Sequence, residues 1–277
     1  MRSRGCGILQ GEWMIRHRKH RTHLVIPDIQ ARQGVPLDHC DWLGRYIAHR
    51  QPAVIVCLGD LWDYKSLSSY DEGKKAAEGV RLVDDFNAGC EAIKRIMEPW
   101  YGMWDPGTGE AYVPELYFTR GNHENRRNRY ENDFPKLAGA LPNETEFMRD
   151  LGWTCPDFLE PITVDGITYS HYFCRGANGK VNQSKRGQPS AVAQAKRGMC
   201  TSIAGHAQGL DSAIVDSCKG RVRAIIAGSY YLHDEAYKSP QGNNHWHGVL
   251  WLNRVKGGDF DLTEVSIGYL QEEYGNG

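Results

Sequence analysis

Three short apolar runs of this chain each end in a group of polar side chains. Residues 25–30 read VIPDIQ, residues 54–63 read VIVCLGDLWD, and residues 117–124 read YFTRGNHE. Short apolar runs bounded by turn residues predict buried strands, and ligands bind beyond the carboxyl ends of such strands in open α/β sheets. Carboxylates, amides and an imidazole at three strand ends therefore predict one convergent site for metals and an anionic substrate.

The order of the predicted elements indicates a single domain of the α/β class. The first half alternates between strands and helical segments, over residues 23–27, 38–50, 53–58, 73–99, 114–119 and 127–151, with Asp38 as an N-cap. The second half is expected to hold short strands and one helix, over residues 159–164, 167–173, 189–199, 222–228, 247–254 and 260–268. This pattern predicts a parallel βαβ half followed by an antiparallel half.

The amino-terminal end of the chain and one internal segment fall outside this pattern. Residues 1–21 are predicted to be a flexible extension and residues 22–277 one domain. The amino terminus lacks the apolar core of a signal peptide, and no apolar run approaches the roughly 20 residues that cross a bilayer. We therefore expect a cytoplasmic protein without a membrane partner. Residues 175–188 are expected to be a long loop, either functional or disordered.

Two histidine turns complete a set of motifs. His171 follows the run ITYS, and His206 stands in the sequence GHAQ. The ordered set D-x-Q, G-D-x-x-D, G-N-H-E, S-H and G-H-x-Q spans residues 28–208 and resembles the calcineurin-like metallophosphoesterase superfamily, whose usual pattern is D-x-H, G-D-x-x-D, G-N-H-[DE], H and G-H-x-H. The resemblance implies a two-sheet sandwich of mixed strands flanked by helices, with the site at the strand ends between the sheets.

The resemblance also implies a centre for two divalent metal ions. The implied metal ligands are Asp28, Gln30, Asp60, Asn122, His171, His206 and Gln208. Asp60 would bridge the two ions. Asp28 and the two glutamines would complete the first site, and Asn122 and the two histidines would complete the second.

The catalytic groups implied by the resemblance belong to two of these turns. His123 would stand beside the scissile phosphate as a general acid or transition-state stabiliser, and Asp63 would fix its orientation. Glu124 would be a structural residue of its turn. Asn122 and Arg126 would contact the substrate, although a solvated helix start explains the arginines at 126, 127 and 129 equally well. The implied reaction is hydrolysis of a phosphodiester or phosphomonoester by metal-activated water.

Gln30 and Gln208 depart from the family pattern, because each replaces a histidine of the first metal site. A site of carboxylate and amide oxygens favours manganese or magnesium over zinc. We therefore expect Mn²⁺ or Mg²⁺, bound more tightly in the second site. An alternative stays open, in which the first site is empty and the chain is a catalytically degenerate scaffold or binding protein. The presence of both Asp63 and His123 favours the enzyme.

The substrate class is less constrained. The D-R-G continuation of protein phosphatases is absent, because Tyr64 and Lys65 follow Asp63. A nucleotide or nucleic acid is a candidate partner, because aromatic side chains suited to stacking occur at Trp62, Tyr64, Tyr230, Tyr231 and Trp246. The net charge of −1 argues against binding nucleic acid through bulk charge. Trp62 would either cover the metals or pack in the core, and one of His233, His245 and His247 is a further candidate for the site.

Overall fold

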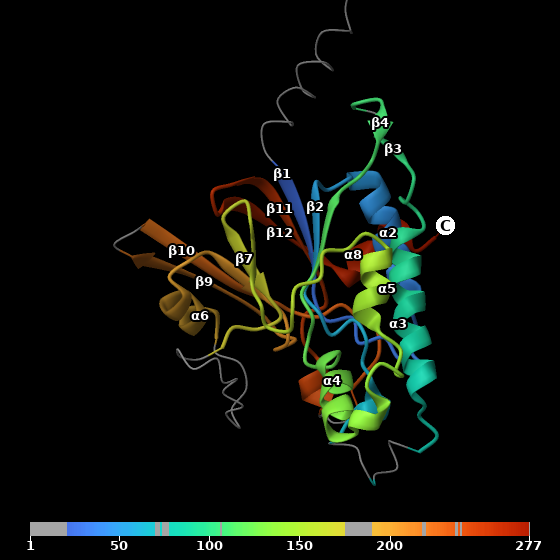
Figure 1. Cartoon of the computed structure of the whole chain (residues 1–277). Coiled ribbons are helices and arrows are strands. Elements are labelled where there is room, and N and C mark those ends of the chain that lie inside the picture. The colour runs from blue at the N-terminus through green and yellow to red at the C-terminus, as the bar shows by residue number, and fades with distance from the viewer. Residues whose placement is uncertain are drawn as a thin grey trace, which may run out of the picture.

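The computed structural model has a mixed α/β architecture, with two five-stranded sheets, one two-stranded sheet and helices around them (Figure 1). It describes residues 21–69, 73, 78–105, 107–174, 190–217, 220–235, 238 and 240–276. The predicted extension up to residue 20 and the predicted loop at 175–188 therefore lie outside the described residues. Within the described ranges, no helix has the length and apolar character needed to span a membrane.

The first sheet contains the three strands that carry the acidic and G-N-H-E motifs. Its order is β12-β11-β1-β2-β5, with bounds Asp259–Ser266, Gly248–Lys256, Arg21–Ile26, Val54–Cys57 and Glu115–Phe118. The strands β1, β2 and β5 are parallel, whereas β11 and β12 are each antiparallel to their neighbour. The carboxyl ends of β1, β2 and β5 therefore meet at one edge, as the sequence predicted.

The second sheet corrects part of the prediction of an antiparallel second half, because it is mixed. Its order is β6-β7-β8-β10-β9, with bounds Ile162–Val164, Ile167–Ser170, Ser202–Ala204, Gly220–Ala227 and Leu210–Ser217. The strands β7, β8 and β10 run parallel, whereas the edge strands β6 and β9 are antiparallel to their neighbours. Helix α6 (Ala191–Gly198) lies in the connection from β7 to β8, as is typical between parallel neighbours. The last two strands, β11 and β12, return to the first sheet.

Apolar side chains fill the space between the two sheets. Val25 and Val56 of the first sheet share one buried cluster with Ile167, Ile203 and Ile225 of the second. The outer face of the first sheet is covered by α2 (Asp38–Arg50), α3 (Leu82–Met97), α5 (Glu144–Asp150) and α8 (Ile267–Tyr274), and α6 covers the second sheet (Figure 1). The helices thus leave the strand ends between the sheets available for a site.

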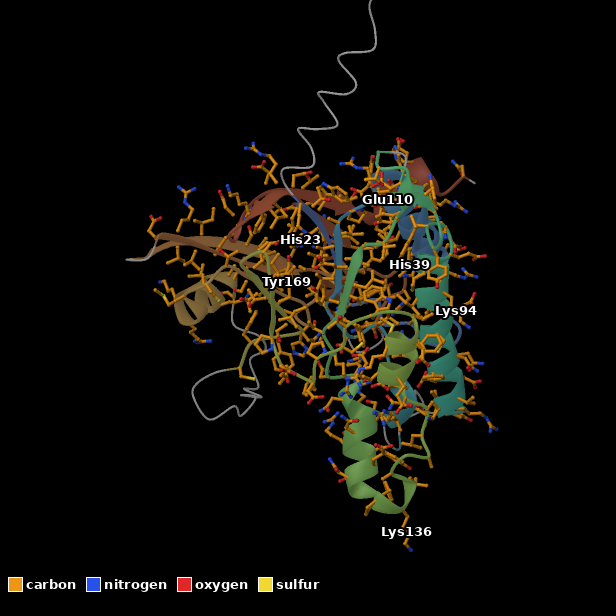
Figure 2. The ribbon with its side chains drawn as sticks, turned by 45° about the horizontal axis from the view of Figure 1, so that its top comes forward. His23, His39, Lys94, Glu110, Lys136 and Tyr169 are labelled. Atoms are coloured by element: carbon orange, nitrogen blue, oxygen red, sulfur yellow. The ribbon has the colours of Figure 1, made fainter. Side chains whose placement is uncertain are left out.

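One polar pair also joins the sheets, near the amino end of β1. His23 of β1 and Tyr169 of β7 lie side by side, with 2.7 Å between Nδ1 and the hydroxyl oxygen (Figure 2). His23 Nε2 lies 3.0 Å from the Asp165 carboxylate. Both ring nitrogens are therefore satisfied, as buried polar groups require.

Several predicted boundaries differ from the structure. Helix α2 begins at Asp38, but Leu37 is its N-cap residue and forms no side-chain hydrogen bond. Helix α3 begins only at Leu82, because Gly79 adopts a φ of 74°, which a helix does not permit. The segment expected to be helical at 127–151 forms α4 (Asn125–Asp133), a 3₁₀ turn (Pro135–Leu137) and α5. The excursion after α3 forms a short hairpin, β3 (Trp104–Asp105) and β4 (Glu110–Ala111), and α7 (Pro240–Asn243) precedes β11.

Candidate metal centre

The turn after β1 presents buried oxygens that the protein leaves unsatisfied. Asp28 Oδ1 accepts a hydrogen bond from the backbone N–H of His206 at 2.9 Å. Asp28 Oδ2 and both amide atoms of Gln30 are buried without a hydrogen-bond partner among the described residues. Burial raises the pKa of Asp28 to about 6. Unpartnered buried polar atoms are costly, so this turn is suited to receive a cation.

Asp60, after β2, is the negative charge at the centre of the site. Its Oδ1 accepts the backbone N–H of His123 at 2.9 Å, and its Oδ2 lies 3.4 Å from His171 Nε2. Burial raises the pKa of Asp60, but the nearby charges of His123 and His171 outweigh burial and hold it well below its usual range. Asp60 is therefore ionised, and its Oδ2 faces two imidazoles, at 3.4 Å from His171 Nε2 and 3.7 Å from His123 Nε2.

Two glycines allow the turns after β2 and β5 to approach closely. A Cβ on Gly121 would lie 2.1 Å from Asp60 Oδ1, and a Cβ on Gly59 would lie 2.3 Å from the carbonyl oxygen of Thr119. The carboxylate of Glu124 joins the same turns by accepting three backbone N–H groups, those of Asp60, Trp62 and Gly121. Burial raises the pKa of Glu124 to about 7. Glu124 thus has the structural role expected for it.

His171, after β7, has one ring nitrogen directed into the site. Its Nδ1 lies 2.7 Å from the carbonyl oxygen of Leu58, to which it donates, and its Nε2 lies 3.0 Å from Asn122 Oδ1. An N–H group bound to a carbonyl fixes the ring and leaves the other nitrogen for a metal. Burial lowers the pKa of His171, but Asp60 raises it to about 9.

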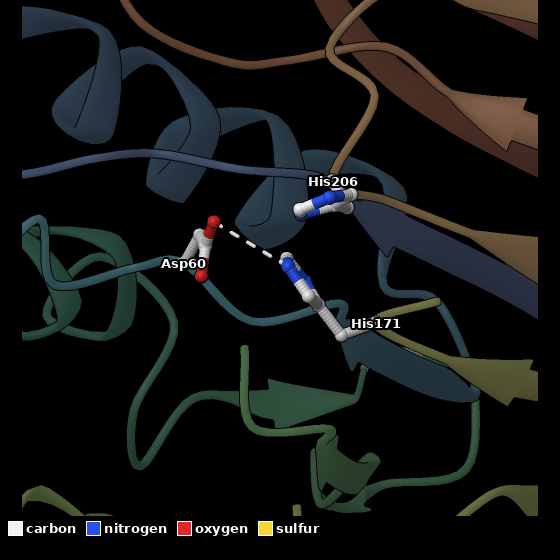
Figure 3. A group of neighbouring side chains, drawn as sticks. All are labelled: Asp60, His171 and His206. Atoms are coloured by element: carbon white, nitrogen blue, oxygen red, sulfur yellow. Dashed lines mark ion pairs between the residues drawn. The ribbon is translucent and has the colours of Figure 1, made fainter. Parts of the chain in front are cut away.

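His206, after β8, completes a group that can hold a metal ion. Burial lowers its pKa to about 4, so its ring is neutral, which is the form that binds metals. One ligand atom each from Asp60, His171 and His206 lies within 4.8 Å of the others (Figure 3). The three side chains come from the ends of β2, β7 and β8 and converge as the sequence predicted.

The predicted pair of His123 and Asp63 lies beside this group. His123 Nδ1 is 3.0 Å from Asp63 Oδ1, and Arg32 donates to Asp63 Oδ2 at 2.7 Å. Burial lowers the pKa of His123, but Asp60 and Asp63 raise it above its ordinary value. Burial raises the pKa of Asp63, but His123 and Arg32 hold it below its usual range. His123 is thereby held in place and favoured in its protonated form.

The arginines after the G-N-H-E motif have different roles. Arg126 donates to the carbonyl oxygen of Asp63 at 2.7 Å, and its Nη2 lies 3.0 Å from His123 Nε2. Arg127 is buried and pairs with Glu144 and Glu131. The structure thus places Arg126 at the site and Arg127 in the core, so a solvated helix start does not describe either residue.

An ion-pair chain behind Asp63 has no signal in the sequence. Arg32 Nη1, which contacts Asp63, also donates to Glu235 at 2.8 Å across a separation of 203 positions. Glu235 in turn lies 2.8 Å from His233 Nε2. His233 therefore supports the site from a distance, through two intervening side chains.

Gln208, the remaining predicted ligand, is held by other side chains. Its Oε1 accepts a hydrogen bond from the Tyr231 hydroxyl at 3.0 Å and another from the Lys238 ammonium. The Tyr231 hydroxyl lies 3.3 Å from His245 Nε2. His247 contacts Ser229 Oγ, at 3.2 Å. His245 is thus linked to the predicted ligand Gln208 through Tyr231, and none of the three candidate histidines belongs to the metal-binding group found among the described residues.

The predicted stripe of stacking aromatics is wrong. Trp62, Tyr64, Tyr230 and Tyr231 are at most 2% exposed. Trp62 packs on Phe86 and donates its indole N–H to the carbonyl oxygen of Phe86, so it belongs to the core and does not cover the candidate metal centre. These aromatic residues follow the ends of β2 and β10, and their side chains are buried in the core. The turns are too short for a hydrophobic period in the sequence to predict this burial.

Four of the predicted ligands share an uncommon backbone conformation. Gln30, Asp60, His206 and Gln208 have φ values of 49°, 48°, 66° and 60°. Such left-handed conformations cost roughly 1–3 kcal/mol each for ordinary residues and cluster at functional sites.

Comparison with known proteins gives no match to a protein-family model and none to a curated protein sequence.

Proposed function

We propose that this chain is a metal-dependent phosphoesterase with the fold and catalytic arrangement of the calcineurin-like metallophosphoesterases. The observation that carries the proposal is the convergence of Asp60, His171 and His206 beside His123. Two facing mixed sheets with this group at their strand ends agree with the resemblance in sequence. The proposed reaction is hydrolysis of a phosphodiester or phosphomonoester.

The donor atoms fit a divalent cation. Asp60, Asn122, His171 and His206 would hold one ion with two imidazoles, a carboxylate and an amide oxygen, and we propose manganese because it accepts both nitrogen and oxygen ligands. The unsatisfied oxygens of Asp28 and Gln30 mark a second position for positive charge beside Asp60. A bound divalent ion would polarise the phosphate and lower the pKa of a water molecule.

The protein's own groups would bind the phosphate and supply the proton. Arg126 Nη2 and His123 Nε2 lie 3.0 Å apart, so that one phosphate group in front of them would accept a hydrogen bond from each. His123, whose pKa is raised by Asp60 and Asp63 against the effect of burial, would then donate its proton to the leaving oxygen. Asp63 would orient the ring throughout.

The structure and the net charge favour a small phosphoester substrate, such as a nucleotide, over a nucleic-acid strand. Four of the five aromatics expected to stack on bases are buried. The net charge of the chain is −1, and phosphate backbones are bound mainly through positive charge.

The proposal is tested by hydrolysis of bis-p-nitrophenyl phosphate and p-nitrophenyl phosphate by metal-stripped protein, before and after addition of manganese. We expect hydrolysis only with the metal, and none in Asp60→Asn. A matched control is Asp216→Asn, which removes an exposed carboxylate on β9 and should leave the rate unchanged. Folded protein that hydrolyses neither ester at any metal concentration would support the scaffold alternative instead.

A further inference from the structure

The two predicted metal sites differ in whether their ligand atoms already accept hydrogen bonds from other side chains. In the second site, His171 Nε2 and one oxygen of Asp60 face each other at 3.4 Å and can both bind an ion. In the first site, Gln208 Oε1 already accepts hydrogen bonds from Tyr231 and Lys238. A carbonyl oxygen has two lone pairs, so both are used. Gln208 therefore does not fit the role of a metal ligand.

Lys238 is held in this position by further contacts. Its ammonium donates to the Tyr231 hydroxyl at 3.0 Å and lies 5.8 Å from the centre of the Tyr231 ring. Tyr231 is itself 2% exposed and stacks on His233, with ring centres 4.6 Å apart. The ammonium is thus fixed by a rigid aromatic side chain beside the turn that carries Gln208.

The charge of Lys238 also acts on the first site. Burial lowers the pKa of Lys238, whereas the carboxylates of Glu235 and Asp28 favour its charged form. Asp28 is completely buried, and its Oδ2 has no hydrogen-bond partner in the described ranges. A buried carboxylate needs a compensating positive charge, and a nearby ammonium can supply it.

We propose that the ammonium of Lys238 takes the place of the first divalent ion, so that the centre binds a single metal ion at Asp60, Asn122, His171 and His206. This inference rests on the proposed function. The positive charge of the centre would then come from one divalent ion and the Lys238 ammonium, beside Arg126 and His123. Gln208 would be adapted to this lysine partner, because its amide oxygen accepts hydrogen bonds from both the ammonium and the Tyr231 hydroxyl, whereas a neutral imidazole nitrogen has a single lone pair to offer.

The experiment counts bound ions. Metal-stripped full-length protein is dialysed against increasing manganese, and bound manganese per chain is measured for the wild type and three variants. We expect one ion in the wild type and two in Lys238→Met, where the positive charge is lost. Lys238→Arg keeps the charge and should bind one ion. Lys256→Met, which removes an exposed lysine on β11, should also bind one.

Electron paramagnetic resonance gives an independent readout, because two neighbouring manganese ions couple their spins and a single ion does not. An uncoupled spectrum for the wild type and a coupled one for Lys238→Met would support the proposal. Two ions in the wild type, a single ion in Lys238→Met or two ions in Lys238→Arg would each overturn it. Wild-type protein that binds two manganese ions and hydrolyses the ester would overturn this inference alone. Wild-type protein that binds no manganese would also overturn the proposed function.

Discussion

His123 and Asp63 face each other across 3.0 Å, from Nδ1 to Oδ1, at the edge of the metal-binding group. The other oxygen of Asp63 is held by Arg32 at 2.7 Å, so the carboxylate cannot turn away from the ring. This arrangement places the proposed proton donor outside the group of proposed metal ligands. Mutations can therefore measure the two proposed contributions separately.

Replacing His123 by alanine should therefore lower kcat by roughly 10²–10⁴-fold, as expected for loss of a general acid, with manganese binding retained. Asp63→Asn should give a smaller loss, because the ring stays in place but loses a charged partner. Steady-state rates and bound manganese are measured on the same samples. Loss of manganese from His123→Ala would identify His123 as a ligand instead.

Asp60→Asn should abolish hydrolysis and weaken manganese binding by at least about tenfold, because a neutral amide replaces the only carboxylate of the group. Asn122→Ala should weaken binding less, since it removes a neutral ligand. Calorimetric titration with manganese measures both affinities, with Asp216→Asn as the control. Equal affinities in Asp60→Asn and the wild type would remove Asp60 from the metal site.

The polar turns at the strand ends could be predicted because each of them directly follows an apolar run in the sequence. Apolar runs followed by Asp28, Asp60 and Asn122 locate three turns, and the parallel order of β1, β2 and β5 follows from the intervening helices. The convergence of His171 and His206 on Asp60 follows from the resemblance, although their motifs are short.

The parts that were missed depend on distant contacts. Arg32 and Glu235 are in contact although they lie 203 positions apart in the sequence, and Lys238 contacts Gln208 across 30 positions. No local sequence pattern predicts either contact. The return of β11 and β12 to the first sheet is equally non-local, since a strand's period does not state which sheet it joins. The burial of Trp62, Tyr64, Tyr230 and Tyr231 was missed for the same reason, because it depends on packing against distant parts of the chain.

Helix α3 lies against Trp62 with no room for a side chain at Gly89. A Cβ there would lie 2.0 Å from the indole Nε1, so Gly89→Ala should reduce the free energy of unfolding by about 1–3 kcal/mol through overpacking. At Gly198 of α6, a Cβ would meet Cys200 Sγ at an ordinary 3.6 Å, and Gly198→Ala should not destabilise. Urea unfolding compares the two variants, and equal losses would argue against the tight contact.

His39 of α2 gives a pH dependence that is independent of the metal. Burial lowers its pKa to about 3, against 6.5 for an ordinary histidine, so the unfolded chain binds more protons between these values. Stability should be fully present above pH 6.5 and fall as the pH drops, by roughly 2 kcal/mol from this group at pH 5. His39→Gln should lose about that much less between pH 8 and pH 5 in urea unfolding. An unchanged pH dependence would show that His39 does not contribute.

The most direct measurement is the rate of bis-p-nitrophenyl phosphate hydrolysis by metal-stripped protein as manganese is returned, with bound manganese determined at each point. We expect the rate to rise in proportion to bound metal and to reach its maximum at one ion per chain. Protein that fills with manganese while the rate stays at the uncatalysed value would contradict the assignment of this centre as a phosphoesterase site.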